Sequence, residues 1–150
     1  MRLLDANLLI YAYNRSSPFH EESKRWLESL LSSPEPVCIP WPTLLAFVRI
    51  TTDRRILDQP FTIAEAVEIV DEWLELPMVT SPQPSLRHWA ILREQLTVGQ
   101  ATGPLVPDAH LAALAIEHGA TLCSTDRDFS RFEGLRWENP LAQVGVVNEG

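Results

Sequence analysis

The sequence predicts an α/β fold built on a parallel sheet, and two observations support that prediction. Short apolar runs of strand length alternate along the chain with longer segments whose apolar residues recur at helical spacing. Aspartates stand directly after strand-like runs, where side chains gather at the carboxyl edge of a parallel sheet. The 150 residues contain no internal repeat and have the size of one ordinary domain.

The first part of the chain is predicted to hold one strand and two helices. Residues 3–4 are the apolar core of the strand, and Asp5 ends it. Residues 6–13 follow as a helix. A second helix over residues 18–31 has an apolar face, and the serines and prolines of residues 32–36 end it.

The middle of the chain continues the alternation of strand and helix. Residues 37–39 are a second buried strand, and a third helix runs over residues 41–52. Thr62 is followed three residues later by Glu65, the capping-box pattern that begins a helix. That helix ends close to a short strand at residues 78–79.

The last third of the chain contains the most apolar helix. A helix over residues 85–96 and a glycine- and proline-rich loop precede it. Asp108 is predicted to begin the apolar helix, which is expected to be buried because it is apolar nearly all round, and Gly119 ends it. A strand at residues 121–123 and an edge strand at residues 135–137 complete the predicted sheet.

Composition limits the classes of protein to which this chain can belong. Hydrophobic residues make up 45% of the chain and charged residues 21%, as in soluble globular proteins, and no apolar run is long enough to span a bilayer. Asp5 comes too early for a signal peptide, so we expect a cytoplasmic protein. The net charge of -8 argues against a long basic surface for nucleic acid. It leaves room for a small nucleic-acid site whose metal ion supplies the positive charge.

Four aspartates are the candidate functional residues. Asp5 directly follows the first strand, and Asp126 comes three residues after another strand. Asp108 lies at the N-terminal end of the buried helix, and Asp128 is two residues past Asp126. Because the carboxyl ends of parallel strands meet at one edge of the sheet, we expect these carboxylates to share one cleft.

Carboxylates crowded into one cleft repel one another unless a cation balances them. Hard oxygen ligands suit Mg²⁺, or Mn²⁺, and an ion held in this way can activate a water molecule and neutralise charge on a phosphate. Zinc is disfavoured because the chain lacks a His/Cys ligand set. Cys38 and Cys123 lie in strand-like runs without a CxxC pair and are expected to be buried free thiols.

Each aspartate also has a purely structural interpretation. Asp5 could cap the helix that follows it, and Asp108 could stabilise a helix N-terminus through the helix dipole. Asp126 and Asp128 could be ordinary turn residues, and Asn7 could bond its local backbone. The joint pattern of the four acids favours a shared site over four separate local roles.

Three motifs resemble the PIN-domain family, and more narrowly the ribonuclease toxins of VapBC toxin–antitoxin pairs. They are L-D-A-N at residues 4–7, P-D-A-H-L-A-A-L-A-I-E-H-G-A at residues 107–120 and S-T-D-R-D-F-S-R-F at residues 124–132. The sequence W-E-N-P at residues 137–140 resembles one subgroup of these toxins. The last two of the three motifs are specific in combination, whereas L-D-A-N alone is weak. The resemblance covers residues 1–140.

The resemblance implies a fold, an activity and roles for individual residues. The fold would be a three-layer α/β/α sandwich with a central, mostly parallel sheet over residues 1–140, followed by a C-terminal tail at residues 141–150. The activity would be Mg²⁺- or Mn²⁺-dependent cleavage of RNA. The implied metal ligands are Asp5, Asp108 and Asp126, with Asp128 as an accessory acid. Asn7 and Thr125 would support these ligands by hydrogen bonding.

The chain departs from the family pattern at one position. The family usually carries a glutamate on the helix after the second strand, and here Ala46 stands at that place. Asp53 lies about two helical turns further on and is a poor geometric substitute. We therefore expect one metal ion, with water completing its coordination.

The functional hypothesis is hydrolysis of an RNA phosphodiester by a toxin. The resemblance implies a small VapB-like antitoxin that covers an apolar face and places a basic side chain near the acids. Five aromatic residues could instead line a groove or a homodimer face, or fill the core: Trp26, Trp41, Phe47, Trp73 and Trp89. Arg15, Arg54 and Arg55 are candidates for contacting the RNA.

Two rival hypotheses come from other classes of function. The missing glutamate would fit a degenerate PIN domain that binds RNA or protein without cleavage. A phosphatase of the haloacid dehalogenase type would use Asp5 as nucleophile, but it needs an acid where Asn7 stands.

The histidines are expected to be outside the site. His110 should point away from Asp108 on the helix and have a structural role, while His88 and His118 should be surface residues. Arg49 is either a phosphate contact or a surface or ion-pair residue.

Overall fold

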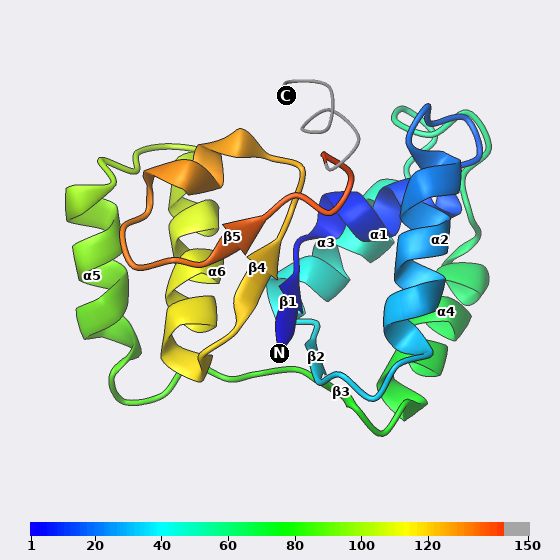
Figure 1. Cartoon of the computed structure of the whole chain (residues 1–150). Helices are drawn as coiled ribbons and strands as arrows, with labels where there is room; N and C mark the ends of the chain where they lie inside the picture. The colour runs from blue at the N-terminus through cyan, green and yellow to red at the C-terminus, as the bar shows by residue number, and fades with distance from the viewer. Residues whose placement is uncertain (143–150) are drawn as a thin grey trace, which may run out of the picture.

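A five-stranded parallel sheet forms the centre of the protein, as a computed structural model that describes residues 1–142 shows (Figure 1). The strand order is β3-β2-β1-β4-β5, and all four neighbouring pairs are parallel. The strands are short, and their bounds are β1 Arg2–Leu4, β2 Val37–Cys38, β3 Val79–Thr80, β4 Thr121–Cys123 and β5 Trp137–Glu138.

The central strand β1 sets the position of the carboxyl edge of the sheet. Leu4 is paired with Cys123 of β4, so both strands end at the same level. The next backbone N–H, that of Asp5, donates to the Cys123 carbonyl at 3.0 Å. The chain segments after β1 and β4 therefore leave the sheet side by side.

Four helices cover one face of the sheet. Leu4, Ile39 and Cys123 point to this face and pack with buried residues of these helices, among them Phe47 and Trp73. The ring centroids of Phe47 and Trp73 lie 4.7 Å apart, and this contact joins the third and fourth helices. The helix bounds are α1 Ala6–Tyr13, α2 His20–Leu31, α3 Trp41–Thr51 and α4 Ile63–Glu75.

Two helices cover the opposite face, so the predicted three-layer α/β/α arrangement is confirmed (Figure 1). Strand residues Leu3, Cys38 and Leu122 point to this face. They pack against the apolar helix α6 and the short 3₁₀ helix η1. The bounds are α5 His88–Val98, α6 Leu105–His118 and η1 Arg127–Arg131. Cys38 and Cys123 are buried free thiols, as expected.

Several helix boundaries differ from the prediction, and the difference at α6 concerns the site. This helix begins at Leu105, so Asp108 is its fourth residue and does not begin it. Pro107 belongs to the proline-rich segment predicted as a loop, and in the structure it lies inside the first turn of the helix. A proline is tolerated there because the first N–H groups of a helix have no intrahelical partner. Helices α2 and α5 begin at His20 and His88, later than predicted.

The C-terminal tail predicted at residues 141–150 lies mostly outside the described residues. Leu141, its first residue, packs against the core on the α1–α4 side. Within residues 1–142, no helix combines the length and apolar character needed to cross a membrane.

Candidate metal centre

Asp5 is held in place from two sides at the end of β1. Its Oδ1 atom accepts a hydrogen bond from the Ala6 N–H at 2.8 Å, which makes it the N-cap of α1. Its Oδ2 atom accepts from the Ser124 hydroxyl at 2.7 Å. Asp5 therefore does cap α1, and the capping hydrogen bond holds its carboxylate at the carboxyl edge of the sheet. Burial raises the pKa of Asp5, and the nearby Asp126 adds to the increase.

Ser124 connects the two chain segments that leave the sheet. This fully buried hydroxyl donates to Asp5 and accepts from the Asp126 N–H at 3.0 Å. The Ser124 carbonyl accepts from the indole N–H of Trp137 at 3.0 Å. The sequence reasoning did not single out Ser124. The sequence feature that could have indicated Ser124 is a small hydroxyl residue directly after a strand and two residues before Asp126.

Asn7 extends this network, and its predicted supporting role is consistent with its contacts. Its Nδ2 group donates to the hydroxyls of Ser124 at 3.1 Å and Thr125 at 2.9 Å. Its Oδ1 atom is buried and accepts no hydrogen bond from the described residues. A buried acceptor of this kind needs a further donor, such as a water molecule at the site.

Asp126 and Asp128 lie in the turn after β4. Asp126 caps η1, because its Oδ1 atom accepts from the Asp128 N–H at 2.9 Å. This bond is typical of a turn aspartate, and it also orients both carboxylates at the start of the same short helix. Asp128 is exposed and Asp126 half-buried.

Asp108 faces these two acids from the first turn of α6. Burial, with the charges of Asp126, Asp5 and Asp128, raises the pKa of Asp108 to about 6, and Arg131 opposes this increase. A carboxyl group with so high a pKa is held in a place where negative charge is already concentrated.

The fold brings three of the four predicted acids within reach of one ion. Oxygen atoms of Asp108, Asp126 and Asp128 all lie within 4.8 Å of one another. Asp5 lies beside this set. Its negative charge raises the pKa of Asp108, and the charge of Asp126 raises the pKa of Asp5. The donors are hard carboxylate oxygens, and their mutual repulsion is the condition that a divalent cation relieves. The cluster could therefore hold a divalent metal ion.

The position predicted to lack a glutamate carries no acid in the structure. Ala46 is half-buried on α3, one turn after Thr43, whose buried hydroxyl donates to the Leu4 carbonyl at 2.8 Å. Asp53 does not replace the missing acid, because both of its oxygens bind Arg55, at 3.1 and 3.0 Å. Exposed Arg49 has no salt bridge among the described residues.

The histidines form a separate network between α5 and α6. His88 Nδ1 lies 3.0 Å from Glu117 Oε1, and His88 Nε2 lies 3.0 Å from His110 Nδ1. The prediction that His88 is a surface residue was wrong, since its side chain is buried in this helix pair. His110 faces α5, in agreement with its expected structural role. His118 lies near the surface, where Nε2 contacts the Gln83 carbonyl at 3.0 Å.

Comparison with known sequences finds relatives over nearly the whole chain. A family model described as "PIN domain" matches residues 2–135. The protein is 44% identical to Ribonuclease VapC37 of Mycobacterium tuberculosis over 142 residues, 95% of this chain and 99% of the relative. It is 38% identical to Ribonuclease VapC43 of the same organism, over 94% of this chain and 96% of that one.

Comparison with solved structures finds the same fold in toxin–antitoxin proteins. VapC20 of Mycobacterium tuberculosis, described as a toxin that cleaves the sarcin-ricin loop, aligns with a TM-score of 0.65 and 19% identity, over 91% of this chain and 99% of that chain. A chain of the VapBC2 complex of Rickettsia felis, bound to a promoter DNA fragment, aligns with a TM-score of 0.65 and 20% identity, over 92% of this chain and 97% of that chain. At these identities the likeness concerns the fold.

Proposed function

The chain belongs to the PIN-domain family, and from this premise we propose that it is a Mg²⁺-dependent endoribonuclease, the toxin of a toxin–antitoxin pair. One observation supports the site most directly. Three aspartates from two separate elements place carboxylate oxygens within 4.8 Å of one another at the carboxyl edge of the sheet. Curated relatives at 37–44% identity are named as VapC ribonucleases, which supports RNA as the substrate.

The proposed reaction is hydrolysis of an RNA phosphodiester. Water adds to phosphorus, one P–O bond breaks, and the departing ribose oxygen takes up a proton. Asp108, Asp126 and Asp5 would hold Mg²⁺, or Mn²⁺ in its place, and Asp128 would assist. When bound, the ion supplies positive charge against the phosphate and makes water more acidic.

The side chains around the acids would orient them for this task. Ser124 fixes one oxygen of Asp5, and the Asp128 N–H fixes one oxygen of Asp126. Asn7 holds the hydroxyls of Ser124 and Thr125, so the two segments that leave the sheet keep their spacing. Such supporting contacts set the direction of metal ligands and influence affinity strongly.

The test is an RNA cleavage assay with matched variants. We expect cleavage by the wild-type protein in Mg²⁺, no cleavage in EDTA, and a loss of at least about 100-fold in Asp126→Asn. Asp53→Asn is the control, because it removes a carboxylate that is paired with Arg55 outside the cluster. Cleavage that persists in EDTA, or in Asp126→Asn, would overturn the proposed mechanism.

A second candidate function follows from the alanine at position 46. A PIN domain without the usual helix glutamate could bind RNA or protein and not cut. Titration of the wild-type protein with Mn²⁺ separates the two functions. Binding of an ion together with RNA cleavage supports the nuclease, whereas RNA binding without ion binding and without cleavage supports the rival.

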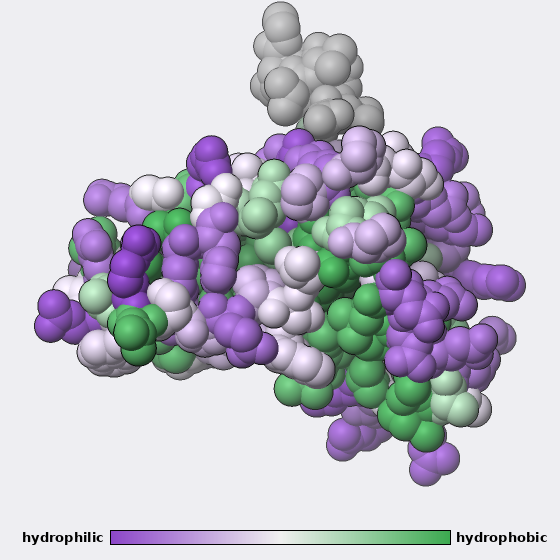
Figure 2. Space-filling model, turned by 90° about the horizontal axis from the view of Figure 1, so that it is seen from below, coloured by the Kyte–Doolittle hydropathy of each residue, from purple (hydrophilic) through white to green (hydrophobic). Residues whose placement is uncertain are grey.

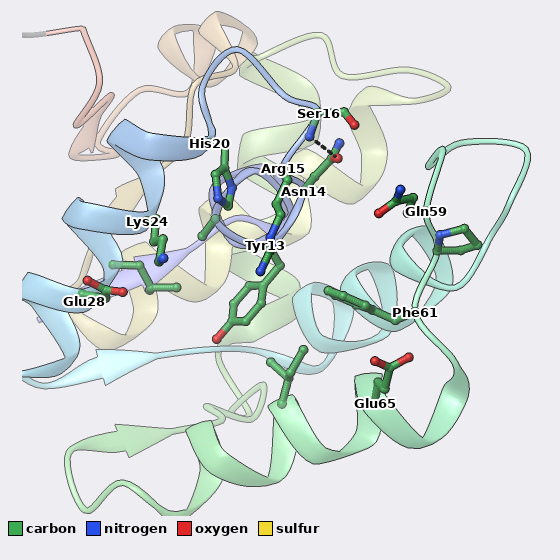
Figure 3. A pocket seen from close by; sticks show the side chains of 14 residues that line it. Tyr13, Asn14, Arg15, Ser16, His20, Lys24, Glu28, Gln59, Phe61 and Glu65 are labelled. Atoms are coloured by element: carbon green, nitrogen blue, oxygen red, sulfur yellow. Dashed lines mark hydrogen bonds between the residues drawn. The ribbon is translucent and has the colours of Figure 1, made fainter.

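A cleft on the α1–α4 side is the proposed docking site for an antitoxin segment (Figure 3). Its volume is about 530 Å³, and it lies between the end of α1, α2, the loop at residues 59–61 and α4. Tyr13 and Phe61 supply apolar surface, while Lys24, Glu28 and Glu65 supply charges of both signs. An amphipathic peptide has the chemistry to match such a lining.

The cleft is also well placed relative to the acids. Helix α1 begins next to Asp5 and has 8 residues, so its far end lies about 12 Å away. A segment that leaves the cleft along α1 would reach the carboxylates with a basic side chain. Lys24→Glu should weaken binding of the VapB-like antitoxin that we propose as the partner, measured by calorimetry. Arg25→Glu, on the same helix but outside the cleft, should leave binding unchanged, and equal effects would exclude the cleft.

We also propose that the protein is a homodimer. Helix α4 exposes Ile63, Val67 and Leu74 at helical spacing, and neighbouring α3 exposes Trp41 and Leu45. Figure 2 shows apolar side chains gathering on the side of the molecule where Figure 1 places α4. An exposed apolar patch of this kind is typical of a protein interface.

A further inference from the structure

Arg131 lies at the edge of the acid cluster and is not bound to it. It is the last residue of η1, three residues after Asp128. Asp126 caps this short helix and Asp128 lies in its first turn, so a single five-residue helix connects Arg131 to two of the acids. Among the described residues, however, no carboxylate lies within 4.0 Å of it. Arg131 thus lies near several carboxylates but forms an ion pair with none of them, so its guanidinium is available to bind another anion.

A backbone carbonyl holds Arg131 in this position. Its Nη1 atom donates to the Gly99 carbonyl at 3.0 Å, at the C-terminal end of α5. Gly99 is needed there because an added Cβ would meet the Gln95 carbonyl oxygen at 2.6 Å and the Phe132 ring at 3.0 Å. Phe132 is itself buried. The packing thus fixes both the residue after Arg131 and the carbonyl to which Arg131 bonds.

The remaining N–H groups of Arg131 make no hydrogen bond among the described residues, and the side chain is exposed. A guanidinium has five N–H donors in a planar fork that matches two oxygens of a phosphate. The hydrogen bond to Gly99 uses one of these donors. Because it already restricts the side chain, less conformational entropy is lost when Arg131 binds a ligand. The geometry therefore leaves a pre-positioned, phosphate-matching cation beside the acids.

We propose that Arg131 binds a phosphate of the RNA strand at the acid cluster and is a substrate-positioning residue. This inference rests on the proposed ribonuclease function and adds a residue to it. An RNA backbone must approach four carboxylates in an acidic protein, so a fixed positive charge at the entrance lowers the repulsion that opposes binding. Arg131 would also set the position of the strand relative to the acids.

Arg136 provides a matched control from the same protein. Its Nη2 atom donates to the carbonyl of Gly119, the C-cap of α6, at 2.6 Å. Arg131 and Arg136 are thus both exposed arginines on the carbonyl of a glycine that ends a helix. They differ in location, because Gly119 lies at the opposite edge of the sheet, before β4. A purely structural role as a helix cap would make the two arginines equivalent.

The experiment compares Arg131→Gln with Arg136→Gln in cleavage of a single-stranded RNA at several salt concentrations. We expect Arg131→Gln to raise KM about tenfold, as for the loss of a charge-assisted hydrogen bond, with a smaller change in kcat. The slope of log kcat/KM against log salt should become shallower by about 0.7, the value for one lost phosphate contact on a single strand. Arg136→Gln should match the wild type in both measurements.

Two further measurements separate the effect of the Arg131 charge from an effect on the metal site. Arg131→Lys retains the charge and should restore most of the salt slope, and every variant that folds should bind Mn²⁺ at least as tightly as the wild type, because Arg131→Gln removes a positive charge near the acids. Equal KM values and salt slopes for Arg131→Gln and Arg136→Gln would overturn the inference while leaving the nuclease intact. Absence of RNA cleavage by the wild-type protein would instead overturn the proposed function.

Discussion

The carboxyl group of Asp108 shows how the fold concentrates negative charge at one point. Burial and three neighbouring acids raise its pKa to about 6, above the value of 3.8 for a free aspartate. Between these values the folded protein binds a proton that the unfolded chain has released. Stability therefore decreases as the pH rises through this window, because folding must then accommodate the charged carboxylate.

We accordingly predict that Asp108→Asn stabilises the protein at pH 7.5 in EDTA, by on the order of 1 kcal/mol after solvent screening. The gain should shrink toward pH 4, where the native carboxyl group is already protonated. Thermal unfolding at the two pH values measures it. Asp53→Asn should have the opposite sign at pH 7.5, because hydrogen bonds from Arg55 lower the pKa of Asp53. A lower Tm for Asp108→Asn at pH 7.5 would contradict this account.

The sequence carried much of the information about the acids but not about the residues that hold them. Asp5 and Asp126 could be placed because each follows a strand, and parallel strands end at one edge. The family resemblance implies an accessory role for Asp128, and in the structure an oxygen of Asp128 lies within 4.8 Å of oxygens of Asp108 and Asp126. Ser124 was missed because a serine after a strand is common, and its contact with Asp5 joins residues 119 positions apart.

At the scale of elements, α5 is attached to α6 by a buried polar network. Burial opposes the charge on Glu117, but hydrogen bonds from Ser85 and His88 hold its pKa below the ordinary value. His88 in turn contacts His110 on the helix that carries Asp108. This network fixes α5, which contributes few residues to the core, against the most apolar helix of the fold.

We predict that His88→Ala lowers the free energy of unfolding by about 1–3 kcal/mol, because it leaves buried polar groups of Glu117 and His110 with fewer partners. Denaturant unfolding provides the measurement. His118→Ala is the control: its ring makes one contact near the surface, with the Gln83 carbonyl, and its loss should cost less than about 1 kcal/mol. Equal losses in the two variants would show that the His88 network adds no stability.

The elements themselves were predicted better than their ends. Alternating strand and helix patterns identified all five strands and six α-helices of the described chain, because apolar periodicity reflects burial directly. Helix α6 begins three residues earlier than predicted, since Pro107 is compatible with the first turn. His88 was wrongly predicted to be a surface residue. The sequence pattern of a helix does not show whether a polar side chain will be buried with a hydrogen-bond partner far away in the chain, as His88 is with Glu117.

For the whole molecule, we base the prediction of a dimer on the exposed apolar side chains of α3 and α4. Val67 is 47% exposed and lies between Ile63 and Leu74 on the same side of α4. We predict that Val67→Glu converts a dimer to a monomer in light scattering, because it puts a charge into the apolar interface. Glu68→Lys, on the polar side of the helix, should remain dimeric. A wild-type monomer at working concentration would contradict this proposal.

Above all, we propose that the carboxylate cluster holds the divalent ion on which RNA cleavage depends. The most direct measurement titrates the wild-type protein with Mn²⁺ and records ion binding and RNA cleavage in the same samples. We predict that the cleavage rate rises in proportion to the fraction of protein with a bound ion, and that Asp126→Asn loses ion binding and cleavage together. Full cleavage in samples that contain no bound ion, or tight Mn²⁺ binding retained by Asp126→Asn, would contradict it.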